Sequence, residues 1–187
     1  MSEQPRPKKN LIYLAGFMGS GKSTIGPILA NTLGFDFVDV DRFVEKKAEK
    51  RIIDIFSTDG EQAFRVLERS TLQEVSTLDH CVVSLGGGTI AYEENFQLIR
   101  QSGIIVYLQL PPEEIHQRVH HRTDRPLLTD PSGGKLPEEA MQQRIQELLK
   151  QREEFYARAD LIIRTDKKKV GTTVDEIVRR LRGLIDA

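Results

Sequence analysis

One stretch of the sequence decides the fold: residues 11–24, which read LIYLAGFMGSGKST. Its first five residues form a continuous apolar run, the pattern of a buried parallel strand. The segment from Gly16 to Ser23 then matches G-x-x-x-x-G-K-[ST], and apolar positions at helical spacing follow as far as Leu33. A strand, a glycine-rich loop and a helix in this order are typical of a nucleotide site, so we predict one here.

The residue types in this loop suit the binding of phosphate. Glycines let successive backbone N–H groups face a phosphate, and the helix N-terminus adds its positive end. We expect Lys22 to bridge the β- and γ-phosphates and the Ser23 hydroxyl to ligate Mg²⁺. A glycine-rich turn that matches by chance is the alternative, with a probability below about one per cent at average composition. The motif predicts nucleotide binding, but it does not specify a reaction.

The rest of the chain alternates between strand and helix patterns. Further strands are predicted at residues 35–40, 81–85, 104–109 and 161–163. Helices are predicted at residues 41–50, 61–77, 93–101, 138–159 and 173–185, and Pro111 opens another. This alternation predicts right-handed crossovers and a parallel sheet that is covered on both faces. Residues 122–136 contain prolines, glycines and charges, and we predict a mobile loop there.

Bulk composition limits the class of protein. The chain has 187 residues, which fits one domain, and a formal net charge of −1, which gives no global basic field for nucleic acid or anionic membranes. Its single cysteine, Cys81, excludes an internal disulfide and is expected to be buried at a strand start. Met1 to Asn10 are polar, and no apolar run approaches the roughly 20 residues that cross a bilayer, so we expect a cytoplasmic protein.

Unusual residues follow the second and third predicted strands, where ligands of a parallel sheet gather. Asp39 and Asp41 stand two apart, so in an extended segment both carboxylates point to one side. One could then hold a metal through water while the other orients an attacking hydroxyl, unless Asp41 is merely a helix N-cap. The glycines 86–88 permit a ligand to approach the backbone closely, or else they simply turn the chain into a helix.

Several arginines are candidates for anion binding. Arg65 could present a guanidinium fork to a substrate carboxylate, or it could pair with Glu68 on a solvated helix face. Arg152 and Tyr156 lie four apart on one helix face, where surface and packing roles would also explain them.

Three further arginines flank the predicted mobile loop: Arg118, Arg122 and Arg125. In a phosphoryl-transfer enzyme such cations could arrive with loop closure and neutralise developing charge. The alternative is a solvated basic face. The four histidines show no spacing typical of a metal site, so we interpret them as surface or helix-end residues.

Together these features resemble the shikimate kinase family over nearly the whole chain. The resemblance rests on residues 16–24, Asp39-Val40-Asp41, Asp-Ile-Phe with Gly-Glu-x-x-Phe-Arg at 54–65, the glycines 86–88, Arg-Pro-Leu-Leu at 125–128, and Arg152 with Tyr156. One departure is Glu154, which stands where the family often has proline. The resemblance implies a three-layer α/β/α fold, like that of nucleoside monophosphate kinases, with a five-stranded parallel sheet in the order 2-3-1-4-5. It further implies one domain over residues 1–187, with an ordered core from 8 to 187 and a lid at about 122–136.

The resemblance also implies a reaction, in which ATP with Mg²⁺ phosphorylates the 3-hydroxyl of shikimate on the route to chorismate and aromatic amino acids. By the family's pattern, ATP contacts Gly19, Ser20, Gly21, Lys22, Ser23, Thr24, Arg118 and Arg125. Shikimate contacts Asp41, Phe56, Phe64, Arg65, Glu68, Gly86, Gly87, Gly88 and Arg152. The metal is held by Ser23 and, through water, by Asp39, and the catalytic residues are Asp41, Lys22 and Arg125. ATP and shikimate are thus the expected partners of a monomer that binds neither nucleic acid nor membranes.

Two other functions remain open at this point. The first is another small-molecule P-loop kinase, such as one resembling gluconate kinase, which also phosphorylates an acidic polyol. The second is a nucleotide-binding regulatory module without catalysis.

Overall fold

The computed structural model describes residues 10–120, 126–128, 134 and 136–185. Within these residues five strands form one parallel sheet: β1 (Leu11–Ala15), β2 (Asp36–Asp39), β3 (Cys81–Ser84), β4 (Ile104–Gln109) and β5 (Leu161–Arg164). Their order is β2-β3-β1-β4-β5, so the predicted sheet and its order are confirmed. The central strand is β1, whose Tyr13 aligns with Val83 on β3 and Ile105 on β4.

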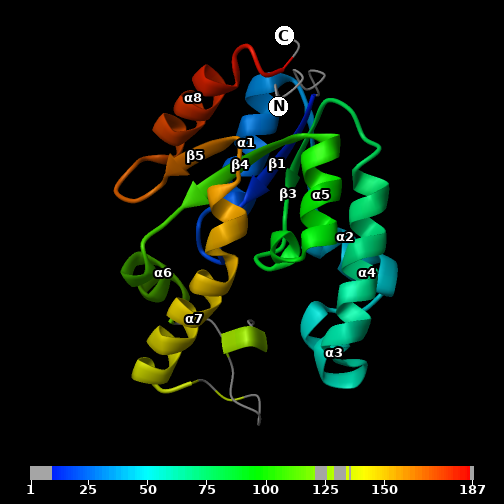
Figure 1. Cartoon of the computed structure of the whole chain (residues 1–187), viewed down its shortest axis with the longest axis vertical. Coiled ribbons are helices and arrows are strands. Elements are labelled where there is room, and N and C mark those ends of the chain that lie inside the picture. The colour runs from blue at the N-terminus through cyan, green and yellow to red at the C-terminus, as the bar shows by residue number, and fades with distance from the viewer. Residues whose placement is uncertain (1–9, 121–125, 129–133, 135, 186–187) are drawn as a thin grey trace, which may run out of the picture.

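Helices cover both faces of this sheet (Figure 1). One face carries α1 (Lys22–Leu33) and α8 (Val170–Leu181). The other carries α2 (Val40–Ala48), α3 (Ile52–Thr58), α4 (Gly60–Val75) and α5 (Glu93–Ser102). Beyond the carboxyl ends of the strands lie α6 (Pro112–Val119), the start of α7 (Glu138–Ala157) and the short turn η2 (Pro126–Leu128), and a second short turn, η1 (Thr89–Ala91), follows β3.

The alternation of side chains on β1 explains why its sequence is apolar throughout. Tyr13 and its alternate neighbours pack into the cluster that includes α2, α4 and α5, whereas Ile12 and Leu14 pack against α1 and α8. All five residues are at most 1% exposed, because each face of the strand is covered by helices. A third cluster fixes the loop after β1, since Phe17 packs there with Val119 of α6 and Ile145 of α7.

Two local predictions were wrong. Helix α3 occupies a stretch for which we predicted no element, and it packs through the fully buried Ile55. The second strand ends at Asp39 rather than at residue 40, and α2 begins directly at Val40. Cys81 is buried as predicted. No helix among the described residues has the length and apolar content needed to span a membrane.

Candidate active site

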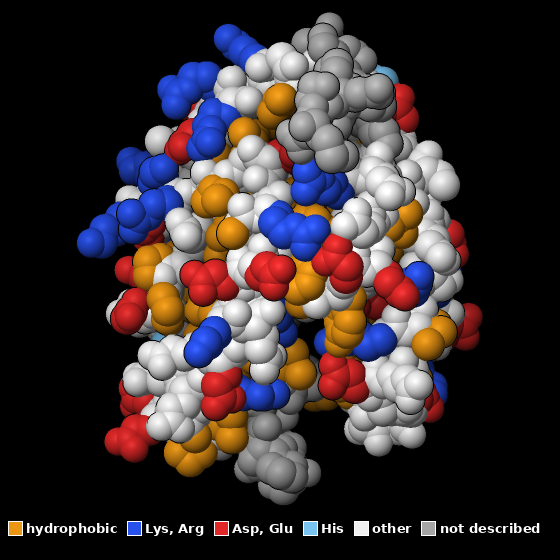
Figure 2. Space-filling view, in the orientation of Figure 1, with side chains coloured by type: hydrophobic (Ala, Val, Ile, Leu, Met, Phe, Trp, Pro, Cys, Tyr) orange, Lys and Arg blue, Asp and Glu red, His pale blue; other side chains and the backbone are white. Residues whose placement is uncertain are grey.

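A cavity of about 840 Å³ opens at the carboxyl ends of the strands. The space-filling view shows the hollow between the side of the molecule that carries α3 and the side that carries α6 and α7 (Figure 2). Its walls come from the first glycine loop, from helices α1 to α4, α6 and α7, and from residues 86–88, which we call the glycine turn. Two halves, one suited to phosphate and one to an acceptor, can be distinguished by their residues.

The phosphate half is the loop that leads into α1. Gly19 and Gly21 have φ values of 80° and 98°. Residues with a side chain rarely adopt such values, so these positions need glycine. Gly21 is the N-cap of α1, no side chain caps this end, and the first turn of the helix carries no acidic residue. No acidic side chain of the first turn therefore neutralises the free N–H groups and the positive end of the helix dipole. This arrangement is a ready-made phosphate site.

The predicted phosphate-binding side chains differ in orientation. The amino group of Lys22 donates to the Gly16 carbonyl at 2.7 Å and the Phe17 carbonyl at 3.1 Å, which holds it across the loop. Ser23 and Thr24 are exposed and line the cavity. The Ser20 hydroxyl, in contrast, is fully buried and has no hydrogen-bond partner among the described residues. Ser20 can therefore contact a nucleotide only through its backbone.

The predicted lid arginines are only partly covered by the described residues. Arg118 lies in the last turn of α6, is exposed, and donates to the Gly19 carbonyl at 3.1 Å. It lines the cavity beside the phosphate loop, and its predicted contact with the nucleotide stays a prediction. Arg122 and Arg125 lie outside the described residues, as does most of the predicted lid.

Asp39 and Asp41 both line the cavity, but they are not an extended pair as we predicted. Asp39 ends β2 and caps α2 by accepting from the Arg42 N–H at 3.2 Å, so Asp39 and not Asp41 is the N-cap. Asp41 lies in the first turn of α2. A Cβ atom added to Gly86 would lie 2.6 Å from Oδ1 of Asp41, so this carboxylate reaches the glycine turn.

The glycine turn has little room for side chains. A Cβ atom on Gly86 would also meet the Thr89 hydroxyl at 2.8 Å. One on Gly88 would lie 3.3–3.4 Å from the guanidinium groups of Arg65 and Arg152. Both guanidinium groups therefore meet at Gly88, although they come from α4 and α7. We call Arg65 and Arg152 the guanidinium pair.

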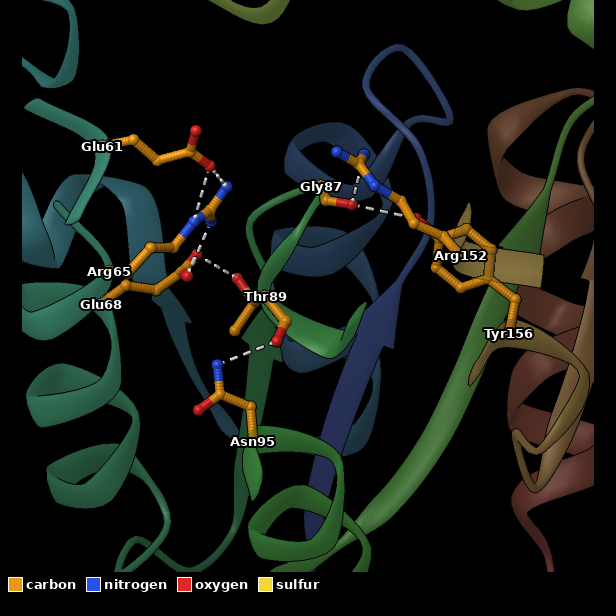
Figure 3. A network of polar contacts seen from close by, with 8 residues as sticks. All are labelled: Glu61, Arg65, Glu68, Gly87, Thr89, Asn95, Arg152 and Tyr156. Carbon is orange, nitrogen blue, oxygen red and sulfur yellow. Dashed lines mark hydrogen bonds and ion pairs between the residues drawn. The ribbon is translucent and has the colours of Figure 1, made fainter. Parts of the chain in front are cut away.

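Arg65 is held by carboxylates on two sides (Figure 3). Its Nε and Nη2 donate to Glu61 at 3.2 and 2.8 Å, and its Nη1 donates to Glu68 at 2.9 Å. These contacts use three of the five N–H groups and leave one on each Nη, at the nitrogens that approach Gly88. Burial acts to lower the pKa of Arg65, but its ion pairs with Glu68 and Glu61 raise that pKa above the ordinary value. Arg65 thus stays charged, with one N–H group on each Nη still available as a donor.

Arg152 is more deeply buried, at 4% exposure. Its Nη1 donates to the Gly87 carbonyl at 2.8 Å, and its guanidinium lies 5.1 Å from the Phe17 ring centre. No carboxylate among the described residues pairs with it. Burial lowers the pKa of Arg152, and the charge of Arg65 lowers it further, against an opposing effect of Tyr156. A buried cation without an anion is costly, so this position favours an anionic ligand.

The remaining acceptor residues form the wall of the cavity. The Phe56 and Phe64 rings contact each other with centres 4.9 Å apart, and both line the cavity. Glu68 is 1% exposed and accepts from the Thr89 hydroxyl at 2.5 Å as well as from Arg65. The structure therefore brings every predicted acceptor residue into one cavity: Asp41, Phe56, Phe64, Arg65, Glu68, Gly86, Gly87, Gly88 and Arg152.

Sequence reasoning missed several residues that support this site. Glu61 was not predicted, although its position four residues before Arg65 on one helix is a recognisable signal. Asn95 donates to the Thr89 carbonyl at 3.0 Å, and no local pattern indicates that contact. Arg42 and Arg51 also line the cavity, and neither was singled out.

A phosphate-binding loop and an acceptor pocket with two guanidinium groups share one cavity at the edge of a 2-3-1-4-5 sheet. This fold and site define a P-loop kinase of a small anionic acceptor. The family model described as shikimate kinase matches residues 18–182. The chain belongs to the shikimate kinase family, and the predicted family and enzyme class are confirmed.

Individual relatives agree with this placement. A shikimate kinase of Chlorobaculum parvum is 53% identical over 172 residues, which are 92% of each chain. The solved structure of shikimate kinase from Acinetobacter baumannii in complex with shikimate superposes with a TM-score of 0.84. It is 34% identical and covers 92% of this chain and 93% of its own. The membership excludes the second alternative, a regulatory module without catalysis.

The first alternative, a kinase that resembles gluconate kinase, shares only its fold with this chain. A gluconokinase from Sinorhizobium meliloti superposes with a TM-score of 0.58 over 96% of this chain and 95% of its own, at 18% identity. This likeness reflects the common P-loop kinase architecture and carries no information about the acceptor.

Proposed function

We propose that this enzyme transfers the γ-phosphoryl group of ATP to the 3-hydroxyl of shikimate. The observation that carries this proposal is the guanidinium pair, in which a buried Arg152 without a carboxylate partner and the two remaining Arg65 donors meet at Gly88. Shikimate supplies one carboxylate for that position and ring hydroxyls for the opposite wall. A relative whose solved structure is named as a complex with shikimate supports the same acceptor.

The nucleotide is proposed to bind in the phosphate half of the cavity. Backbone N–H groups from Gly19 to Thr24 surround its phosphates, and the start of α1 faces them with the positive end of its dipole. Lys22, which already lies across the loop, contacts the β- and γ-phosphates and neutralises charge that develops during transfer. Arg118 packs beside the nucleotide at the outer edge. The nucleotide contact of Arg125 stays a prediction of the resemblance, because this residue lies outside the described residues.

Asp41 is the proposed catalytic carboxylate of the acceptor. Its Oδ1 lies at the glycine turn, in the cavity that the phosphate loop and the guanidinium pair also line. From there it accepts a hydrogen bond from the attacking hydroxyl, orients the oxygen toward the γ-phosphorus and takes the proton as the O–P bond forms. Because the transition state is loose, most of the rate enhancement comes from positioning and from cationic charge.

Magnesium fits the oxygen donors at the border of the two halves. The exposed Ser23 hydroxyl and the half-buried Asp39 carboxylate both line the cavity, and hydroxyl and carboxylate oxygens are the ligands Mg²⁺ accepts. We propose that Ser23 binds the ion directly and Asp39 through water. The bound ion would supply charge neutralisation at the phosphate oxygens.

Assembly, domain extent and location remain predictions. We propose a monomer with one domain over residues 1–187 on the resemblance to the family alone. A cytoplasmic location is proposed on the ground of family membership alone.

A coupled assay of ADP release tests the proposed function. With MgATP present, addition of shikimate should start steady release of ADP, and the product should carry phosphate on the 3-hydroxyl. Gluconate and related sugar acids form the comparison panel, since the other candidate acceptor class would use them. Turnover of gluconate without turnover of shikimate would overturn the proposal.

A further inference from the structure

The glycine turn and Thr89, which follows it, are held by two buried side chains that the reaction chemistry does not use (Figure 3). From α5, Asn95 donates to the Thr89 carbonyl at 3.0 Å. From α7, the Tyr156 hydroxyl donates to the Gly87 carbonyl at 3.0 Å, beside the contact that Arg152 makes with the same oxygen at 2.8 Å. Tyr156 therefore contacts a residue of the turn that also lines the cavity.

The position of the Gly87 carbonyl also sets the position of the Gly88 N–H, because both groups belong to the same planar peptide. The bond between Gly87 and Gly88 is trans, as are all the described peptide bonds, so the Gly88 N–H points opposite to the Gly87 C=O. That N–H has no acceptor among the described residues. Gly88 is also the residue at which the guanidinium pair meets. Fixing the carbonyl thus fixes one more donor for an anion at this position.

Tyr156 is itself rigid. It is 2% exposed, and its ring stacks on that of Tyr107 with centres 4.4 Å apart and planes 6° from parallel. Burial raises the pKa of the Tyr156 hydroxyl, so the group keeps its proton and remains a donor across the physiological range. A stacked ring with a fixed hydroxyl holds the peptide more firmly than a flexible chain could.

We propose that Tyr156 is a positioning residue, which holds the peptide between Gly87 and Gly88 so that its N–H and Arg152 face the carboxylate of the acceptor. This inference rests on the proposed function, because the acceptor in question is shikimate. It adds a residue whose hydroxyl never touches the substrate, and it assigns that hydroxyl to acceptor affinity rather than to nucleotide binding or to the chemical step.

The test is Tyr156→Phe, which removes one oxygen and keeps the stacked ring. The matched control is Tyr107→Phe, which removes a hydroxyl from the other ring of the stack, one that makes no described contact with the glycine turn. We expect the shikimate KM to rise about threefold to tenfold in Tyr156→Phe, as for the loss of one buried hydrogen bond. The ATP KM should stay unchanged, and Tyr107→Phe should match the wild type in both.

Hydrogen exchange gives a second readout that does not depend on turnover. In Tyr156→Phe the Thr89 amide, which donates to the Gly86 carbonyl at 3.2 Å, should exchange faster than in the wild type, while the amides of β1 should not change. An unchanged shikimate KM, or an equal rise in both KM values, would overturn the positioning role and leave the proposed function intact. A wild-type enzyme without shikimate turnover would refute the proposed function, and the positioning role would fall with it.

Discussion

Replacing Gly88 with alanine would place a methyl group at the point where the guanidinium pair meets. Its Cβ atom would lie 3.3 Å from Nη2 of Arg65 and 3.4 Å from Nη2 of Arg152, in the space assigned to the carboxylate of the acceptor. The backbone tolerates the change, since Gly88 has φ −111° and ψ −8°, which alanine adopts readily. The close neighbours are the ends of flexible side chains, so the protein should still fold.

The expected loss follows from the contacts that the methyl group blocks. Hydrogen bonds to charged groups contribute about 1.5–3 kcal/mol each, so loss of one or two costs about 3 kcal/mol, or roughly a hundredfold in kcat/KM for shikimate. The ATP KM should not change, because the phosphate loop is untouched. Initial rates with each substrate varied in turn measure both quantities.

Gly171→Ala is the control, since a Cβ atom there meets nothing within 4 Å and lies within α8, far in the fold from the glycine turn. It should keep wild-type kinetics and melt at the same temperature or slightly higher. If Gly88→Ala binds shikimate within about threefold of the wild type, less than one charged hydrogen bond has been lost. The carboxylate would then not bind at Gly88, and the assignment of the guanidinium pair would be wrong.

Three further changes test other parts of the structure. Asp41→Asn should lower turnover by about 10²–10⁴-fold with an unchanged ATP KM, and wild-type turnover would remove Asp41 from the mechanism. Burial raises the pKa of Tyr13 from 10.0 to about 12, so its contribution to stability is complete below pH 10 and is lost as pH rises toward 12. Urea unfolding across that range should show a steeper decline for the wild type than for Tyr13→Phe, and identical slopes would contradict the shift. Gly103→Ala puts a Cβ atom 2.3 Å from the Leu11 carbonyl of the central strand, so it should destabilise by about 1–3 kcal/mol or more, and an unchanged melting temperature would refute this.

Local motifs account for what the sequence predicted well. The phosphate half of the site lies in consecutive residues from Gly16 to Thr24, so its chemistry and its strand-to-helix setting are readable without a structure. The sheet order came from the resemblance, because strand alternation alone specifies a parallel sheet and leaves several orders open.

Contacts between distant residues account for much of what was missed. Gly87 lies 65 residues from Arg152 and 69 from Tyr156, and no spacing rule connects positions so far apart. Helix α3 was missed because its sequence begins with two isoleucines, which favour strands, and its helical form depends on packing of Ile55. The Asp39 and Asp41 geometry depended on where β2 ends: the strand stops at Asp39, one residue earlier than predicted, and α2 begins at Val40, so no extended segment connects the two carboxylates.

The guanidinium pair joins two parts of the molecule that are otherwise held by different neighbours. Arg65 belongs to α4, which packs on α2, α3 and α5, whereas Arg152 belongs to α7, which packs on α6 and η1. An anion bound between them acts as a cross-link, so it should raise the melting temperature progressively as its concentration exceeds its Kd. A thermal-shift screen can therefore find acceptor-site inhibitors without any coupled assay, and Gly88→Ala identifies compounds that bind elsewhere.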